Sequence, residues 1–200
     1  MSTRQNFKLS MPEAEARDML LAAYMAEVEH RGRTFVCDEP TLANIAHLAR
    51  FMTSDGPKFG VMFCGLCGNG KTTLLHALQT VINIEADRKG GGRDMPRLLA
   101  VDAKQVVARA KDANSFRELK DSSMMAIEDM GRDAAEVLEY GNVLNPVIDL
   151  IEHRYNCQLF TAITTNLTGE QVRVKYGNRI ADRFNEMIEV IVFKNESYRR

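Results

Sequence analysis

A glycine-rich segment at residues 65–73 has the residue types and the spacing that bind a phosphate chain. Its sequence, GLCGNGKTT, fits the pattern G-x-x-x-x-G-K-[ST] without a mismatch. The apolar run Val61–Cys64 before it predicts a buried strand, and leucines at helical spacing follow it. Because this pattern forms a phosphate-binding loop when it joins a strand to a helix, the sequence predicts such a loop here.

The individual residues of this loop suit that role. Gly68 and Gly70 allow the backbone to curve so that successive N–H groups face a phosphate chain. Lys71 is expected to reach the β- and γ-phosphates of a nucleotide, and the Thr72 hydroxyl is expected to bind Mg²⁺. The residues predicted to contact the nucleotide are Gly65, Gly68, Asn69, Gly70, Lys71, Thr72 and Thr73.

An acidic pair, Glu128 and Asp129, directly follows the apolar residues 124–127, which predict another buried strand. Such a strand would hold both carboxylates beside the metal site. One would orient the water shell of Mg²⁺ and the other would polarise the attacking water. The sequence leaves open which of the two lies nearer the metal. The predicted metal ligands are therefore Thr72, Glu128 and Asp129.

Polar residues also follow the β-branched run 159–164. Asn166 ends the triplet TTN and is expected to hold the hydrolytic water, although such a triplet also caps helices. Arg179 and Arg183 lie four residues apart on one face of a predicted helix, which by itself favours a solvated surface. The candidate catalytic residues are Glu128, Asp129, Asn166, Arg183 and Arg179.

The elements that position these residues alternate along the chain. Runs of apolar and β-branched residues predict strands at 61–64, 98–101, 124–127 and 159–164, and an alternating pattern predicts a strand at 187–193. Helical spacing predicts helices at about 12–31, 41–52, 71–86, 103–111, 115–120, 143–155, 168–175 and 178–185, with a polar connection over 132–140. This order predicts an α/β three-layer sandwich around a mainly parallel five-stranded sheet, with nucleotide at the carboxyl ends of the strands.

The composition is that of an ordinary globular domain. Of 200 residues, 45% are hydrophobic and 26% are charged, and 26 cations nearly balance 27 anions. That balance gives no global case for nucleic-acid binding. The sequence lacks a signal-peptide core and any apolar run near the ~20 residues that span a membrane, so we expect a cytoplasmic protein without membrane contact.

The pair Cys64 and Cys67 lies inside the phosphate loop, and the sequence contains no second C-x-x-C pair, which favours packing over zinc binding.

Taken together, the motifs resemble those of the DnaC/IstB-type branch of the AAA+ ATPases, which are bacterial helicase loaders and transposition helper proteins. The resemblance covers roughly residues 40–200. The motifs that carry it are Gly65 to Thr72, IEDMG at 127–131, YGN at 140–142, ITTNL at 163–167, Arg179 with Asp182 and Arg183, and SYR at 197–199. It implies a P-loop NTPase fold with the sheet order 5-1-4-3-2 and a lid domain that is reduced or absent.

The resemblance also assigns roles. Lys71 and Thr72 fall on Walker A, Glu128 and Asp129 on Walker B, and Asn166 on sensor 1. Arg183 falls on the position of the arginine finger, with Arg179 as the alternative. It implies ATP and Mg²⁺ as cofactors, and an ATPase that is slow as a monomer and faster after self-association with ATP. One departure is the acidic pair, which is Glu-Asp where the branch commonly has Asp-Asp.

The expected division is a helical N-terminal segment at 1–55 and an AAA+ ATP-binding domain at 56–200. The apolar stripe of the first helix permits two interpretations, packing against the domain or docking of a partner. The partners that the resemblance implies are a replicative helicase, which we favour, or a transposase, together with single-stranded DNA. A nucleotide-dependent adaptor with little hydrolysis remains an alternative. A small-molecule kinase is disfavoured because it would need a basic acceptor-binding lid.

Overall fold

The computed structural model describes residues 6–90, 96–133, 137–139 and 142–198, without the side chains of 137–139 and 142–144. Tyr140, Gly141 and Arg199, which contribute to the motifs above, lie outside the described residues. Within the described ranges, no helix is long and apolar enough to cross a membrane.

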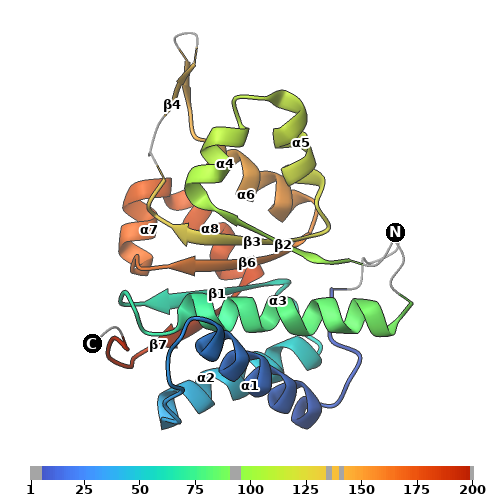
Figure 1. The fold of residues 1–200 in the computed structure, drawn as a ribbon. Coiled ribbons are helices and arrows are strands. Elements are labelled where there is room, and N and C mark those ends of the chain that lie inside the picture. Colours follow the sequence, from blue (N-terminus) through green and yellow to red (C-terminus); the bar gives the residue numbers. More distant parts are fainter. Residues whose placement is uncertain (1–5, 91–95, 134–136, 140–141, 199–200) are drawn as a thin grey trace.

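A five-stranded parallel sheet forms the centre of the molecule (Figure 1). Its strands are β1 (Gly60–Gly65), β2 (Leu98–Asp102), β3 (Met124–Met130), β6 (Phe160–Thr165) and β7 (Ile188–Phe193). They lie in the order β2-β3-β6-β1-β7, and every neighbouring pair is parallel. If the five strands of this sheet are numbered 1 to 5 along the chain, the order is 2-3-4-1-5. Read from the opposite edge it is 5-1-4-3-2, so the predicted strand order is confirmed.

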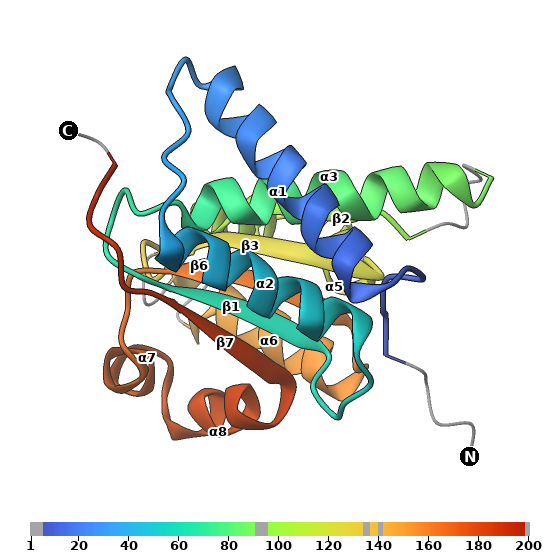
Figure 2. The ribbon, with the colours of Figure 1, turned by 90° about the horizontal axis from the view of Figure 1, so that it is seen from below.

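Helices cover both faces of the sheet and make three layers (Figure 2). One face carries α1 (Glu13–His30), α2 (Glu39–Thr53) and α3 (Lys71–Arg88). The other face carries α4 (Ala103–Arg109), α5 (Ala113–Asp121), α6 (Pro146–Asn156), α7 (Gly169–Tyr176) and α8 (Asn178–Met187). Alternate residues of a strand point to opposite faces, so Val61 and Phe63 join the first core and Met62 joins the second.

The N-terminal helix α1 is part of this packing. Its residues Ala16, Leu20 and Tyr24 are buried against the core that contains α3. Its neighbour α2 starts after Asp38, whose side chain accepts a hydrogen bond from the Thr41 amide at 2.8 Å. The predicted boundaries of both helices agree with the structure to within about two residues.

The segment between β3 and α6, which was predicted to be a polar connection, contains regular secondary structure. It contains a two-stranded antiparallel sheet of β4 (Val137–Glu139) and β5 (Asn142–Leu144), which projects from the sandwich (Figure 1). The following helix begins at Pro146 instead of residue 143. Asn145 caps it by accepting a hydrogen bond from the Ile148 amide at 3.1 Å, and proline suits the first helical turn.

Strand β7 also differs from a simple buried-and-exposed alternation. Ile191 and Phe193 are buried against the α1–α3 layer, and Ile188 is buried on the other face. Val190 and Val192 share the face of Ile188 but are 44% and 51% exposed. The reason is that β7 is an edge strand, and α8, which ends directly before it, contacts it less than α2 does on the opposite face.

Arg154 is the largest fully buried side chain of the described residues, and it has a structural role. Its guanidinium donates to the carbonyls of Ser122 and Phe160, at 2.7 and 2.6 Å, and to the Thr161 hydroxyl at 2.8 Å. Burial lowers the pKa of Arg154 to about 10. This side chain therefore joins α6 to β6 and to the segment that enters β3.

Candidate nucleotide-binding site

A cleft of about 710 Å³ opens at the carboxyl ends of the strands, a size typical of small-molecule sites. Phosphate-loop residues line one part of it. Residues from the end of α1 and the α1–α2 connection line another part, together with Tyr198 from the C-terminal tail. The predicted site residues that line the cleft are Gly68, Asn69, Gly70, Lys71, Thr72, Thr73, Asp129 and Asn166.

The phosphate loop joins β1 to α3, as predicted. Gly70 has φ 97° and Gly68 has φ 83°, which are left-handed conformations that favour glycine. A Cβ atom at Gly70 would also collide with the hydroxyl of Tyr24. The loop therefore requires glycine at position 70 both for its backbone conformation and for its packing against α1.

The amino group of Lys71 lies within the loop. Its Nζ donates to the carbonyls of Gly65 and Leu66, at 2.8 and 2.6 Å, and to Asn69 Oδ1 at 3.1 Å. Only 5% of the residue is exposed. Three short contacts from one ammonium hold the loop in a curve, so a phosphate would meet a positive charge that is already positioned.

The acidic pair lies at an irregularity in β3. Ile127 pairs with Ile163 and Met130 pairs with Thr165, so β3 has one residue more than β6 over this interval. Asp129 occupies the left-handed region with φ 52°, and its amide donates to Thr164 Oγ1 at 2.9 Å. Thr165 Oγ1 donates to the Met130 carbonyl at 2.6 Å. The threonines of β6 therefore stabilise the bulge that turns Asp129 toward the cleft.

Glu128 and Asp129 have different surroundings. Asp129 lines the cleft, and its carboxylate accepts a hydrogen bond from Arg132 at 2.8 Å. Glu128 is absent from the cleft lining, and its Oε1 lies 3.2 Å from His76 Nε2 of α3. This hydrogen bond with Glu128 raises the pKa of His76; burial opposes the rise, and the hydrogen bond with Glu27 adds to it. The two carboxylates are therefore suited to different tasks.

Oxygen ligands for Mg²⁺ are present at this end of the sheet. Thr72 supplies a hydroxyl, and the acidic pair supplies carboxylates, which are the donors that Mg²⁺ prefers. No three His, Cys, Asp or Glu side chains among the described residues gather closely enough to hold a metal by themselves.

The two candidate arginines lie away from the cleft. Arg183 Nη1 is 2.7 Å from Glu152 Oε1 of α6, within ion-pair distance but outside the geometry of a directed hydrogen bond. Its guanidinium also lies 5.0 Å from the centre of the Tyr155 ring, and 11% of its side chain is exposed. Arg179 pairs with the same carboxylate at 3.0 Å, but its side chain is 71% exposed.

The sequence motifs include Tyr198 but give it no role at this site, and they do not include the α1–α2 connection. The Tyr198 amide donates to the Gly68 carbonyl at 2.9 Å, and its hydroxyl contacts Thr41 at 2.8 Å and the carboxylate of Asp38. Tyr24 lines the same cleft, and burial followed by the nearby Tyr198 raises its pKa to about 12. No local pattern marks these contacts, because they join residues far apart in the chain.

Comparisons with known proteins identify the fold. The chain is similar to a crystal structure of the DnaC helicase loader, with a TM-score of 0.61 and 23% identity over 80% of this chain and 93% of that one. It is also similar to DnaI, with a TM-score of 0.60 and 19% identity over 97% of this chain and all of that one. A third similar structure is AMPPCP-bound DnaA from Aquifex aeolicus, with a TM-score of 0.53 and 18% identity over 78% of this chain and 48% of that one.

No protein-family model and no curated protein matches the sequence. The structural likeness and the sheet order nevertheless agree, so the chain has the fold of the DnaC helicase loader and DnaI. The resemblance inferred from the motifs is thereby confirmed for the fold.

Proposed function

We propose that this protein binds and hydrolyses ATP and uses it to load or remodel a partner on DNA, with a replicative helicase as the partner. The observation that carries the proposal is a P-loop cleft within a fold that covers most of the DnaC helicase loader. Such a role places the protein in the cytoplasm. It also places the first 55 residues, which precede the ATP-binding domain, among the candidates for partner contact.

The residues of the cleft divide the work of hydrolysis. Lys71 and the N–H groups of the phosphate loop bind the phosphate chain, with the N-terminus of α3 adding its positive dipole. Thr72 in the cleft and Glu128, which precedes Asp129 and lies outside the cleft lining, would hold Mg²⁺, which neutralises phosphate charge when it is bound. Asp129 accepts the proton of the attacking water, and Asn166 from the neighbouring strand holds that water in line.

Self-association would complete the site with an arginine from a neighbouring copy. The motif position favours Arg183, but exposure favours Arg179, because Glu152 and Tyr155 hold Arg183 within the molecule. We expect Arg179→Ala to keep the melting temperature of the wild type but to lose the stimulation of turnover by assembly, so that turnover of the assembled protein falls by about 10³-fold or more.

We expect Arg183→Ala to lower the free energy of unfolding by about 1–3 kcal/mol, since it breaks a largely buried ion pair.

Thermal unfolding and turnover measured across protein concentration check both variants. If Arg179→Ala keeps normal assembly-stimulated turnover and a stably folded Arg183→Ala loses it, Arg183 is the arginine that acts on the neighbouring copy. Normal turnover in both stably folded variants would remove the trans arginine from the mechanism.

The partner is tested by affinity capture from the native host. The bait is Asp129→Asn with ATP and Mg²⁺, intended to retain ATP, and the matched control bait is Lys71→Ala. Recovery of the replicative helicase by the first bait alone would support the loader. Recovery of a transposase would keep the ATPase assignment but change the partner. If neither is recovered and the wild-type protein does not turn over ATP, the proposal is replaced by an adaptor with little hydrolysis.

Single-stranded DNA is the second partner of the proposal, and its support comes from the family resemblance. We expect a fluorescent single-stranded oligonucleotide to bind in the presence of ATP. If Lys and Arg contact several phosphates, the affinity should fall steeply between low and moderate salt, by about 10³-fold or more for six contacts. An oligonucleotide that does not bind even at low salt would remove DNA from the list of partners.

A further inference from the structure

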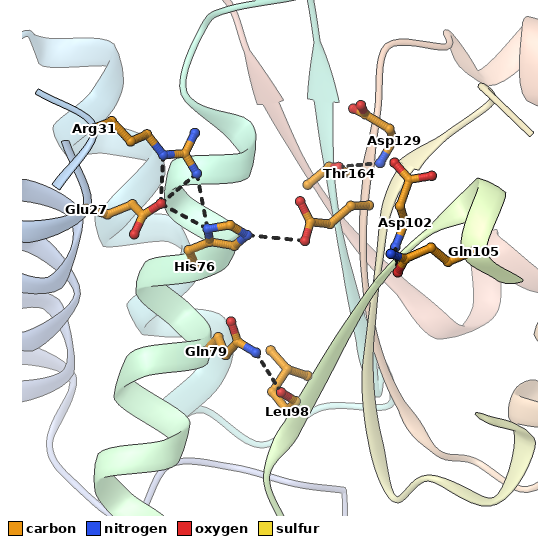
Figure 3. A network of polar contacts seen from close by, with 10 residues as sticks. Glu27, Arg31, His76, Gln79, Leu98, Asp102, Gln105, Asp129 and Thr164 are labelled. Carbon is orange, nitrogen blue, oxygen red and sulfur yellow. Dashed lines mark hydrogen bonds and ion pairs between the residues drawn. The ribbon is translucent and has the colours of Figure 1, made fainter. Parts of the chain in front are cut away.

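His76 connects the N-terminal helix to Glu128 of the acidic pair. Figure 3 shows its contacts with Glu27 and Arg31. On one side, its Nδ1 lies 2.9 Å from Glu27 Oε1 on the last turn of α1 and 3.1 Å from Nη2 of Arg31, the residue that caps the end of α1. On the other side, its Nε2 lies 3.2 Å from Glu128 Oε1 at the end of β3. A single side chain of α3 therefore spans the space between α1 and the proposed metal carboxylate.

The orientation of this contact does not depend on the charge of the imidazole. Nδ1 faces a donor, Arg31, as well as an acceptor, Glu27, so it is satisfied with or without a proton. Nε2 faces the Glu128 carboxylate, which accepts hydrogen bonds. Nε2 therefore carries a proton and donates to Glu128 in both the neutral and the charged form of His76.

Packing does not require this chain of contacts. Leu20 and Tyr24 already bury α1 against the core that contains α3. His76, Glu27 and Glu128 are between 20% and 29% exposed as side chains, and partly exposed ion pairs add little to stability. Carboxylates that ligate a metal are usually held by a hydrogen-bonding partner behind them, and His76 occupies that place.

We propose that His76 is a positioning residue for Glu128, and that it transmits movements of the end of α1 to the Mg²⁺ site. The inference rests on the proposed function and deepens it. Glu27 and Arg31 fix the imidazole, and the imidazole fixes one oxygen of Glu128, which leaves the other oxygen for the metal or its water shell. A partner that shifts the last turns of α1 thereby alters metal-dependent hydrolysis, although it touches no nucleotide.

The first test measures the Mg²⁺ concentration that gives half-maximal turnover, alongside the binding of a fluorescent ATP analogue in EDTA. His76→Ala should raise the Mg²⁺ midpoint by about 10–100-fold and leave binding in EDTA unchanged. Glu27→Ala should raise the midpoint less, and the double variant should be no worse than His76→Ala alone, because Glu27 acts through His76. His76→Gln, which can still donate to Glu128, should recover part of the loss.

The matched control is Gln79→Ala. Gln79 lies one turn further along α3 and donates to the Leu98 carbonyl of β2 at 2.9 Å, so it joins α3 to the sheet without contacting Glu128. We expect this variant to keep the wild-type Mg²⁺ midpoint. An unchanged Mg²⁺ midpoint in His76→Ala would overturn the proposal. It would also be overturned if the shift in the double variant equalled the sum of the shifts in His76→Ala and Glu27→Ala.

A second measurement uses the protein without nucleotide, so it separates this inference from the proposed function. Amide hydrogen exchange of residues 27–31 should rise several-fold in Glu128→Ala, but Glu128→Ala should cause no further rise in the His76→Ala background. If wild-type protein binds no ATP, the proposed function fails while this coupling is still measured. Exchange that responds to Glu128→Ala equally in both backgrounds would overturn the coupling.

Discussion

Lys71→Ala should lose nearly all affinity for ATP. The Nζ of Lys71 lies buried inside the phosphate loop, where it would make charge-assisted hydrogen bonds to two phosphates. Two such bonds of about 1.5–3 kcal/mol each correspond to a loss of roughly 10²–10⁴-fold in affinity. Titration of a fluorescent ATP analogue, followed by its anisotropy, measures the change.

The ammonium also holds the loop carbonyls of Gly65 and Leu66, so a control for folding is needed. Lys71→Met keeps most of the buried stem and should lose affinity in the same way. Lys111→Ala removes a lysine that is exposed and outside the cleft, and it should bind like the wild type. Binding of ATP by a folded Lys71→Ala at wild-type affinity would refute the phosphate-loop assignment.

Asp129→Asn should bind ATP normally and fail to hydrolyse it. Asparagine keeps the shape of the side chain and tolerates the left-handed backbone at φ 52°, whereas alanine would add strain. The amide cannot accept the proton of the attacking water, so turnover should fall by about 10²–10⁴-fold. Single-turnover hydrolysis, with nucleotide affinity measured in parallel, separates the two effects.

Asp55→Asn is the matched control for this change. Asp55 is exposed in the turn before β1, and its substitution should alter neither quantity. Wild-type turnover in Asp129→Asn would transfer the base to Glu128 and leave Asp129 as a structural residue of the bulge. Loss of nucleotide binding would instead place Asp129 among the phosphate or metal contacts.

The sequence predicts the architecture because its signals are local and agree with each other. Each strand of the main sheet is an apolar run, as in a parallel sheet that is covered on both faces. The short strands β4 and β5 lack that signal, and the first turn of α6 depends on a cap at Asn145 that the apolar spacing does not reveal. The exposure of Val190 and Val192 depends on strand order, which no residue of β7 specifies.

For the candidate site, the sequence predicts the residues that belong to motifs and misses those that support them. Gly70 and Lys71 were predicted and lie in the cleft. The roles of His76 and Tyr198 were not predicted, because the contacts described above join residues at least 45 positions apart and follow no recognised spacing. The sequence also left Glu128 and Asp129 interchangeable. The bulge in β3 distinguishes them, since it turns Asp129 to the cleft while His76 holds Glu128.

The strand order has a consequence for how the chain acquires its site. The phosphate-loop strand β1 is made before both of its partners, because Gly60 pairs with Thr161 on one side and with Ile188 on the other. Neither partner exists until about 100 further residues have been synthesised, and such distant parallel pairings form slowly. The strand that leads into the phosphate loop must therefore wait, unpaired at both edges, and the loop that holds Lys71 is not supported until both pairings have formed.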